Sequence, residues 1–443
     1  MWRQLTSLCV VLALIVGALM LGCSGRENPT MTIDPLETSP FRGTVSFSSL
    51  EYNQVGDQPT RIVTVNWASE IPPSQSQAPF PVLYLLHDFD GDGEYFGRFN
   101  MQGILEEMFE AGEIGRLMVV TVGASNTFGG SYYRNSPSSG LYADLISETI
   151  QLIEDVQFPG RVYTTQIGAS ARAIGGHGMG GYGAMRYAME DNEYDFSSVS
   201  SMSAPLSFEA DWDGQPWINR WVDSVFMENG VVDSATYKSM DPTRPYDPSK
   251  VFTNRLFGMS AAFSPRDLDP FDKVDTCFKC ANIFCSSLKP VAPCSLFASV
   301  SPAEYTFEFP PDPDGKRGDT IVAAAPEQPA NVGVDLPALW TKSIVDSIWN
   351  MWLASDATTY LQENPSALSG IEVYVDCGVD DEFGYLYHNR DFREALNAAG
   401  ANYMYEEYSG TATIPAGHSD LVSERLRRVI KYHSDRLARP DGT

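Results

Sequence analysis

One glycine-rich segment carries the clearest chemical pattern in the sequence: Gly176-His177-Gly178-Met179-Gly180. It follows a short predicted strand, Arg172–Gly176, and precedes a helical pattern that starts at Tyr182. A chain that leaves a strand, turns sharply and enters a helix exposes the central residue of the turn, where a nucleophilic side chain is well placed to react. That residue is Gly178, which adopts the strained backbone of such a turn at little cost. It has no side chain with which to attack a substrate.

The segment corresponds to the nucleophile elbow, Gly-x-Ser-x-Gly, with the serine replaced by Gly178. Together with four other stretches, it makes the chain resemble the esterase family of serine hydrolases, which includes S-formylglutathione hydrolase, feruloyl esterases and mycolyltransferases. The other stretches are Pro81–His87, Ser131–Ser136, Ser197–Ser203 and Tyr374–Phe383. The resemblance covers about residues 41–204 and 340–436. It implies an α/β-hydrolase fold and a site for carboxylic ester hydrolysis.

The resemblance also assigns positions to the acid and the base that follow the nucleophile in hydrolase order. Asp381 lies just after a predicted strand ending at Asp376, where the family places its acid, and Asp380 is a close rival. His418 lies in a Gly-His loop before the last predicted helix and takes the place of the base. A packing role in contact with Asp381 is the alternative for His418. Of the other histidines, His87 and His177 are predicted to be structural, and His388 and His433 to be ordinary surface or packing residues on helices.

An oxyanion hole would use two backbone N–H groups, that of Met179 and that of Phe89 or its neighbour Asp88. The family usually has glycine after His87, whereas this chain has the acidic run Asp88–Glu94. Carboxylates that point inward from this run would repel a developing oxyanion. The run also resembles the start of a calcium loop, but Phe99 stands at the twelfth position, which needs an acid. We therefore expect a solvated acidic loop, no metal and no cofactor.

The elements that must position these residues alternate between strand and helix. The continuous apolar run Pro79–Leu86 indicates a strand buried on both faces, and Arg116–Val122 is predicted to be another buried strand. Leu141–Val156 has the apolar spacing of an amphipathic helix. This alternation predicts a mostly parallel central sheet with helices on both faces. We expect the hydrolase core in two parts, 41–204 and 339–437.

An insertion, 205–338, separates the two parts. It is rich in Pro, Asp and Ser, holds most of the cysteines and contains few convincing long helices or strands. Its cysteines have the spacing C-x2-C-x4-C-x8-C, which in a cytosolic protein would suggest zinc. In an oxidising compartment two disulfides are the better interpretation, with a metal site or free thiols as alternatives. The four residues are Cys277, Cys280, Cys285 and Cys294. Cys377, in an apolar strand, is expected to be a buried, inert thiol.

The first 22 residues have the pattern of an export signal: one charge, Arg3, and then an apolar run from Leu8 to Leu21. Gly22-Cys23 resembles the bacterial lipobox, in which the cysteine becomes lipidated, although Met20 and Leu21 depart from its usual residues. A plain secretory signal and a retained anchor helix are the alternatives. Residues 23–40 are expected to form a flexible tether. These features predict an exported lipoprotein of the bacterial cell envelope, anchored in the membrane through Cys23.

The charge balance of the chain limits the kinds of molecule that it can bind. The 443 residues contain 57 Asp and Glu against 30 Lys and Arg, a formal net charge of −27, which repels phosphate backbones and argues against nucleic-acid binding. Because the serine is missing, three functions remain open. The chain could be a degenerate esterase that keeps a pocket for an ester, acyl chain or glycan. It could hydrolyse or transfer acyl groups through His418 and Asp381 without the serine, or it could be a structural or partner-binding surface lipoprotein.

Overall fold

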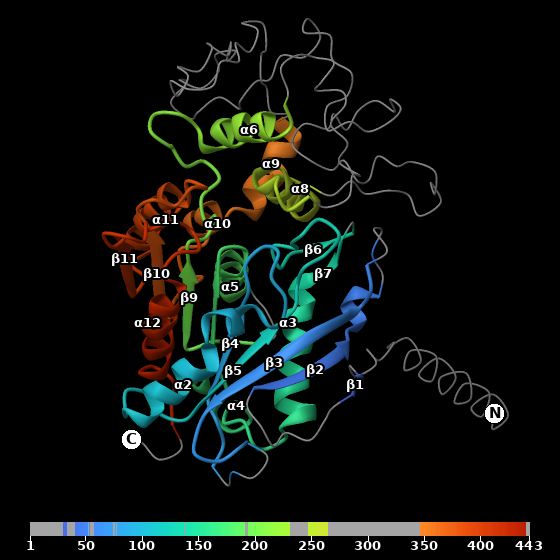
Figure 1. The fold of residues 1–443 in the computed structure, drawn as a ribbon, viewed down its shortest axis with the longest axis vertical. Coiled ribbons are helices and arrows are strands. Elements are labelled where there is room, and N and C mark those ends of the chain that lie inside the picture. Colours follow the sequence, from blue (N-terminus) through green and yellow to red (C-terminus); the bar gives the residue numbers. More distant parts are fainter. Residues whose placement is uncertain are drawn as a thin grey trace, which may run out of the picture.

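In a computed structural model of the chain, nine strands form one sheet with helices on both faces (Figure 1). The structure describes residues 30–32, 40–230, 247–264 and 346–439, apart from positions 52, 54–56, 74, 75, 77, 138 and 191–193. The predicted lipidation site Cys23 and the four insertion cysteines Cys277, Cys280, Cys285 and Cys294 lie outside these residues. Within them, no helix is both long and apolar enough to cross a membrane.

The strands lie in the order β1-β2-β3-β5-β4-β8-β9-β10-β11. The six from β5 to β11 in this order are parallel, whereas β1, β2 and β3 pair antiparallel at one edge. The mostly parallel sheet of an α/β-hydrolase fold is therefore confirmed. The strands are β1 (Thr30–Thr32), β2 (Phe41–Ser46), β3 (Thr60–Ala68), β4 (Val82–Leu86), β5 (Leu117–Val122), β8 (Arg172–His177), β9 (Ser198–Met202), β10 (Glu372–Gly378) and β11 (Tyr403–Tyr408).

Two hydrophobic cores cover the two faces of the sheet, and β4 contributes to both. Val82, Tyr84 and Leu86 belong to the core on the side of α3 (Tyr142–Gln151), α5 (Met179–Met189) and α11 (Tyr385–Ala399). Leu83 and Leu85 belong to the core on the side of α2 (Met101–Glu110) and α12 (Val422–Ser434). Successive side chains of a strand point to opposite faces, so a strand between two helical layers is apolar at every position. This explains the continuous apolar run in the sequence.

The described parts of the insertion contain more regular structure than the sequence suggested. Residues 217–228 form α6 (Trp217–Glu228), and α8 (Val251–Phe263) packs against it and against α9 (Asp346–Ser355). Figure 1 places these three helices together beyond the ends of the central strands. The expectation of few helices in 205–338 was wrong for this part, because α8 is buried on all sides from Thr253 to Phe263 and so lacks the exposed polar face that marks a surface helix.

The predicted tether also contains regular structure. Thr30–Thr32 form β1 and pair antiparallel with Thr44–Ser46 of β2. The alternation within β2 could be recognised in the sequence, but a three-residue edge strand has too few residues for a period to show. Residues 23–40 are thus not a tether throughout.

The parallel strands bring the predicted site residues to one edge of the sheet. His87 and Asp88 follow β4, Gly178 follows β8, and Asp381 lies three residues beyond β10. His418 lies in the loop between β11 and α12. The carboxyl ends of parallel strands share one edge, which is where open α/β sheets hold their ligands.

Candidate functional site

The turn at Gly178 keeps the geometry of a nucleophile elbow without a nucleophile. Gly178 has φ 52° and ψ −114°, directly between the end of β8 and the first residue of α5. Its N–H donates to the Met202 carbonyl at 2.8 Å, and its own carbonyl accepts from Tyr182 N–H at 3.1 Å as the helix begins. A side chain at this φ would be strained by about 1–3 kcal/mol. The prediction of a sharp strand-to-helix turn at Gly178 is confirmed.

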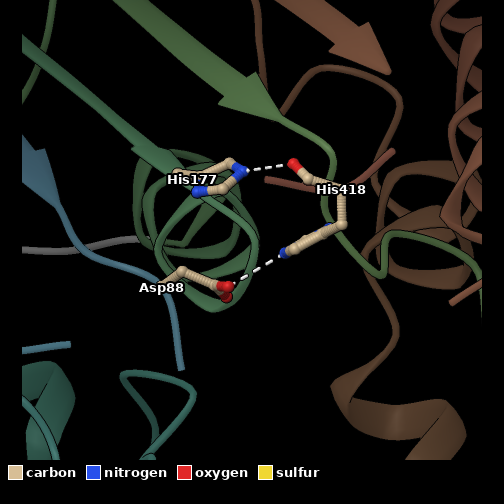
Figure 2. Close-up of side chains that lie close together, drawn as sticks. All are labelled: Asp88, His177 and His418. Atoms are coloured by element: carbon tan, nitrogen blue, oxygen red, sulfur yellow. Dashed lines mark hydrogen bonds and ion pairs between the residues drawn. The ribbon is translucent and has the colours of Figure 1, made fainter. Parts of the chain in front are cut away.

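The place of the missing side chain is taken by Asp88, whose carboxylate points toward the ring of His418 in Figure 2. A Cβ atom on residue 178 would lie far closer than 3.0 Å to Asp88 Oδ1, and 2.9 Å from His418 Nε2. Asp88 Oδ1 also accepts the Met179 N–H at 2.8 Å, which is the backbone donor predicted for the oxyanion hole. The carboxylate therefore fills both the position of the nucleophile and that of the oxyanion. The sequence raised the possibility of an inward carboxylate in this loop. It assigned to Asp88 itself only a backbone N–H in the oxyanion hole.

Arg255 of helix α8 holds this carboxylate from the other side. Its Nη1 donates to Asp88 Oδ1 at 3.2 Å and its Nη2 to Asp88 Oδ2 at 2.8 Å, with both side chains more than nine-tenths buried. Sequence reasoning missed Arg255 altogether. The signal was present, since Arg255 is the single charged residue in the apolar stretch Val251–Phe263, and a buried arginine requires an acidic partner.

His418 lies between two carboxylates. Its Nδ1 is 3.0 Å from Asp381 Oδ2 and its Nε2 is 2.9 Å from Asp88 Oδ2. A carboxylate offers only acceptors, so both ring nitrogens must carry hydrogen and the ring is an imidazolium. Burial opposes this charge, but Asp88 and Asp381 outweigh burial and raise the pKa of His418 to about 9. Near neutral pH the ring cannot accept a proton from a substrate or from water.

Asp88 is correspondingly fixed as an anion. Burial opposes its charge, but Arg255 and then His418 hold the pKa of the carboxyl well below its usual range. The four donors are Met179 N, His418 Nε2 and the two Arg255 nitrogens. A carboxylate has about four lone-pair positions, so none is left for attack on a substrate.

Of the two rival acids, Asp381 contacts the imidazole. Its other oxygen, Oδ1, accepts from Phe383 N at 3.0 Å and Tyr385 N at 3.3 Å, which fixes the carboxylate against the start of α11. Asp380 instead accepts the Ala416 N–H at 3.1 Å and so braces the loop that carries His418.

The remaining histidines are buried and used in packing. His177 stacks on His418 with ring centroids 4.8 Å apart, and its Nε2 donates to the His418 carbonyl at 2.9 Å (Figure 2). His87 accepts the Ala124 N–H at 2.7 Å through Nε2, and His433 bridges two serine hydroxyls of β9. His388 packs edge-on to Trp217. His388 and His433 are therefore packing residues and not surface ones.

Among the described residues, one group could be considered for a metal ion: Asp88, His177 and His418 (Figure 2). Its chemistry is unfavourable for a cation. His177 Nε2 donates to a carbonyl, its Nδ1 is 2.7 Å from the Tyr95 hydroxyl, and His418 already carries a positive charge. The guanidinium of Arg255 satisfies the same carboxylate that an ion would need. The group fits an ion-pair network better than a metal centre.

Phe89, the other predicted oxyanion donor, contributes a buried ring to this site. The guanidinium of Arg255 packs on this ring and on the ring of Phe383. Its central carbon is 5.1 Å from the centroid of the Phe89 ring and 4.4 Å from that of the Phe383 ring.

Cys377 is buried, and burial raises the pKa of its thiol well above the usual value, as expected for an inert side chain.

The family model described as Esterase matches residues 64–425, which include Gly178, Asp381 and His418. The chain belongs to the esterase family. Its curated relatives include Esterase MT1326 and Esterase Rv1288 of Mycobacterium tuberculosis, each 27% identical over 203 residues. The match covers 44% of this chain and spans 42% of the length of each relative.

Solved structures with similar folds include a ferulic acid esterase and the S-formylglutathione hydrolase of Agrobacterium tumefaciens. The first is 16% identical with a TM-score of 0.48, over 91% of this chain and 100% of the other. The second is 15% identical with a TM-score of 0.46, over 93% of this chain and 100% of the other.

Proposed function

We propose that this chain is a non-hydrolytic member of the esterase family that acts by binding. The observation that carries the proposal is the Asp88 carboxylate, which fills the position of the nucleophile and accepts the hydrogen bond of the predicted oxyanion donor Met179. An ester carbonyl could not reach the same N–H while Asp88 is there. The centre has become an internal ion-pair network.

Hydrolysis by His418 and water, without a serine, is the less favourable alternative. A general base must be unprotonated near the working pH, whereas His418 donates from both nitrogens to carboxylates. Even in a serine protease, removal of the nucleophile leaves a rate only ~10³–10⁴ above that of water. Here the base and the oxyanion donor are occupied as well.

The proposed location is the bacterial cell envelope, with a lipid anchor on Cys23 and an ester, acyl chain or glycan as the class of ligand. The support is the apolar export signal followed by Gly22-Cys23 in the sequence. We expect a radioactive fatty acid to label the wild-type chain and not to label Cys23→Ala. A wild-type chain that takes up no label would exclude the anchor.

The activity half of the proposal is tested by incubation of the purified chain with short p-nitrophenyl esters and, separately, with a fluorophosphonate probe. We expect no ester turnover above the buffer rate and no covalent label, because the probe needs an activated hydroxyl. Turnover in the wild type that disappears in His418→Ala would overturn the proposal.

A second candidate is a partner-binding protein whose insertion is the working surface. The observation in its favour is the ion pair between Arg255 and Asp88. Through this pair, the carboxylate at the former catalytic position holds the insertion helix α8 against the core. Cross-linking of intact cells that captures one partner with the wild type, and not with a chain lacking residues 265–338, would favour this function.

A further inference from the structure

The direction of strand β1 determines where the N-terminal segment enters the sheet. Thr30, the first residue of β1, pairs with Ser46 at the end of β2, and Ser46 pairs with Thr60 at the start of β3. Strand β3 runs antiparallel to β5, so its first residues lie at the carboxyl edge of the parallel strands. The chain therefore enters the sheet at the same edge that carries the site residues.

The chain between the proposed lipid anchor and this strand is short. Residues 24–29 separate Cys23 from Thr30. An extended chain spans at most ~3.3–3.6 Å per residue, so this segment reaches about 25 Å however it is arranged. A tether made of the whole stretch 23–40 would have reached about 60 Å.

These two lengths differ in what they allow, because they lie on either side of the size of the molecule. Nine strands spaced ~4.8 Å apart place β11 about 40 Å from β1 across the sheet. A tether of about 60 Å would let any face of the molecule meet the bilayer. A tether of about 25 Å holds the bilayer close to one corner of the sheet. We define this anchor corner by the start of β1, the end of β2 and the start of β3.

Electrostatic attraction does not offer another orientation for the chain as a whole. The formal net charge of −27 is repelled by anionic headgroups, so the tether is what brings the molecule to the membrane. Figure 1 shows the insertion helices α6, α8 and α9 beyond the ends of the central strands, at the edge where β1 begins. The insertion and the former catalytic position thus belong to the same edge as the anchor corner.

We propose that the anchor corner is the surface of this protein that faces the lipid bilayer. The carboxyl edge of the sheet then lies nearer to the membrane than the amino edge, and the amino end of β11 lies farthest away. This inference rests on the proposed lipid anchor at Cys23 and adds to it the surface through which the anchored chain meets its membrane.

The test compares three single cysteine substitutions that carry the same fluorophore. Glu51→Cys lies just after the short helix Ser48–Leu50 at the carboxyl edge, and Glu70→Cys lies just beyond the end of β3 at the amino edge. Both glutamates are exposed, and the nine residues of β3 separate the two edges by about 30 Å. Ala398→Cys, exposed in the last turn of α11, marks the corner remote from the anchor.

The full chain is purified from bacterial membranes with its lipid and reconstituted in phosphatidylcholine vesicles that contain a nitroxide-labelled headgroup lipid. The wild type without an added cysteine measures any reaction of native thiols. We expect the label at position 51 to lose most of its fluorescence and the labels at positions 70 and 398 to keep theirs. A linker of about twenty Gly and Ser residues inserted before Thr30 adds roughly 25 Å of root-mean-square reach, so it should remove the difference between positions 51 and 70.

Equal quenching at positions 51 and 70 in the chain with its natural tether, or stronger quenching at 70, would overturn the proposal. A difference that persists with the long linker would overturn the tether as its cause. Flotation of the vesicles is measured on the same samples. A chain that does not float with them lacks the anchor, whereas a chain that floats but is quenched equally at both positions retains the anchor without this orientation, so the two failures are distinguishable.

Discussion

Arg255 and Asp88 are 167 positions apart in the sequence, yet the guanidinium of one and the carboxylate of the other form a bidentate ion pair. The pair joins helix α8 of the insertion to the loop that follows β4. Breaking a buried pair is costly because it leaves one charge without a partner, whereas replacing both partners can be nearly neutral. This asymmetry gives a direct test of the network.

Arg255→Met should lower the free energy of unfolding by about 3–5 kcal/mol, because Asp88 keeps only His418 as a counter-ion in a buried site. Asp88→Asn should destabilise by a similar amount. The double variant Asp88→Asn/Arg255→Met should cost clearly less than the sum of the two. Urea denaturation of the four proteins gives the coupling energy.

Arg428→Met is the control for this cycle. Arg428 pairs with Glu406 at 2.9 Å, but both side chains are exposed, and such pairs contribute only about 0–1 kcal/mol. Additive effects of the two Asp88 and Arg255 substitutions would show that the pair does not act as a unit.

Gly178→Ser alone should not create an esterase, because its Cβ would overlap the Asp88 carboxylate. Gly178→Ser/Asp88→Gly removes the overlap and frees the Met179 N–H. We expect fluorophosphonate labelling of the double variant, at a slow rate because Arg255 then lacks its partner, and none of either single variant. Labelling of Gly178→Ser alone would mean that Asp88 moves aside readily.

The pKa of His418 predicts a loss of stability in alkali. The folded pKa is about 9, above the ordinary value near 6.5, so the folded chain holds this proton more tightly than the unfolded chain. The resulting stabilisation is complete below about pH 6.5 and is lost as the pH rises through 9. Urea unfolding between pH 6 and 10 should show this decline in the wild type and a smaller one in His418→Gln. Equal slopes would assign the decline to other groups.

The four insertion cysteines should form two disulfides. Each bridge would add about 2–4 kcal/mol by restricting the unfolded chain, provided that it is unstrained. Mass spectrometry of the non-reduced protein should find no free thiol at Cys277, Cys280, Cys285 or Cys294. Four free thiols, or one zinc per chain, would contradict this pairing.

Local patterns in the sequence were sufficient for the sheet and for the turn at Gly178. Strands buried on both faces are apolar at every position, as in β4, and a glycine-rich strand-to-helix turn has a distinct spacing. The choice between Asp380 and Asp381 could not be made, because adjacent residues at a strand end differ only in side-chain direction. The structure resolves it through the 3.0 Å contact of Asp381 with His418.

The role of Asp88 could not be derived from any local pattern. Whether an aspartate after a strand points to solvent or inward depends on what it meets, and here it meets a hydrogen-bond donor 91 positions away and an arginine 167 positions away. The first partner, Met179, begins the helix that follows strand β8, and the second, Arg255, lies in the insertion helix α8. No period or spacing connects the three segments.

The overlap between a Cβ at position 178 and the Asp88 carboxylate makes a serine at the elbow and Asp88 in its present position mutually exclusive. The two residues therefore behave as one unit under mutation, although they lie on different loops. A single change that restores the serine meets the carboxylate, and a single change of Asp88 leaves a glycine that cannot attack. Recovery of a nucleophile at this elbow therefore requires changes at both positions.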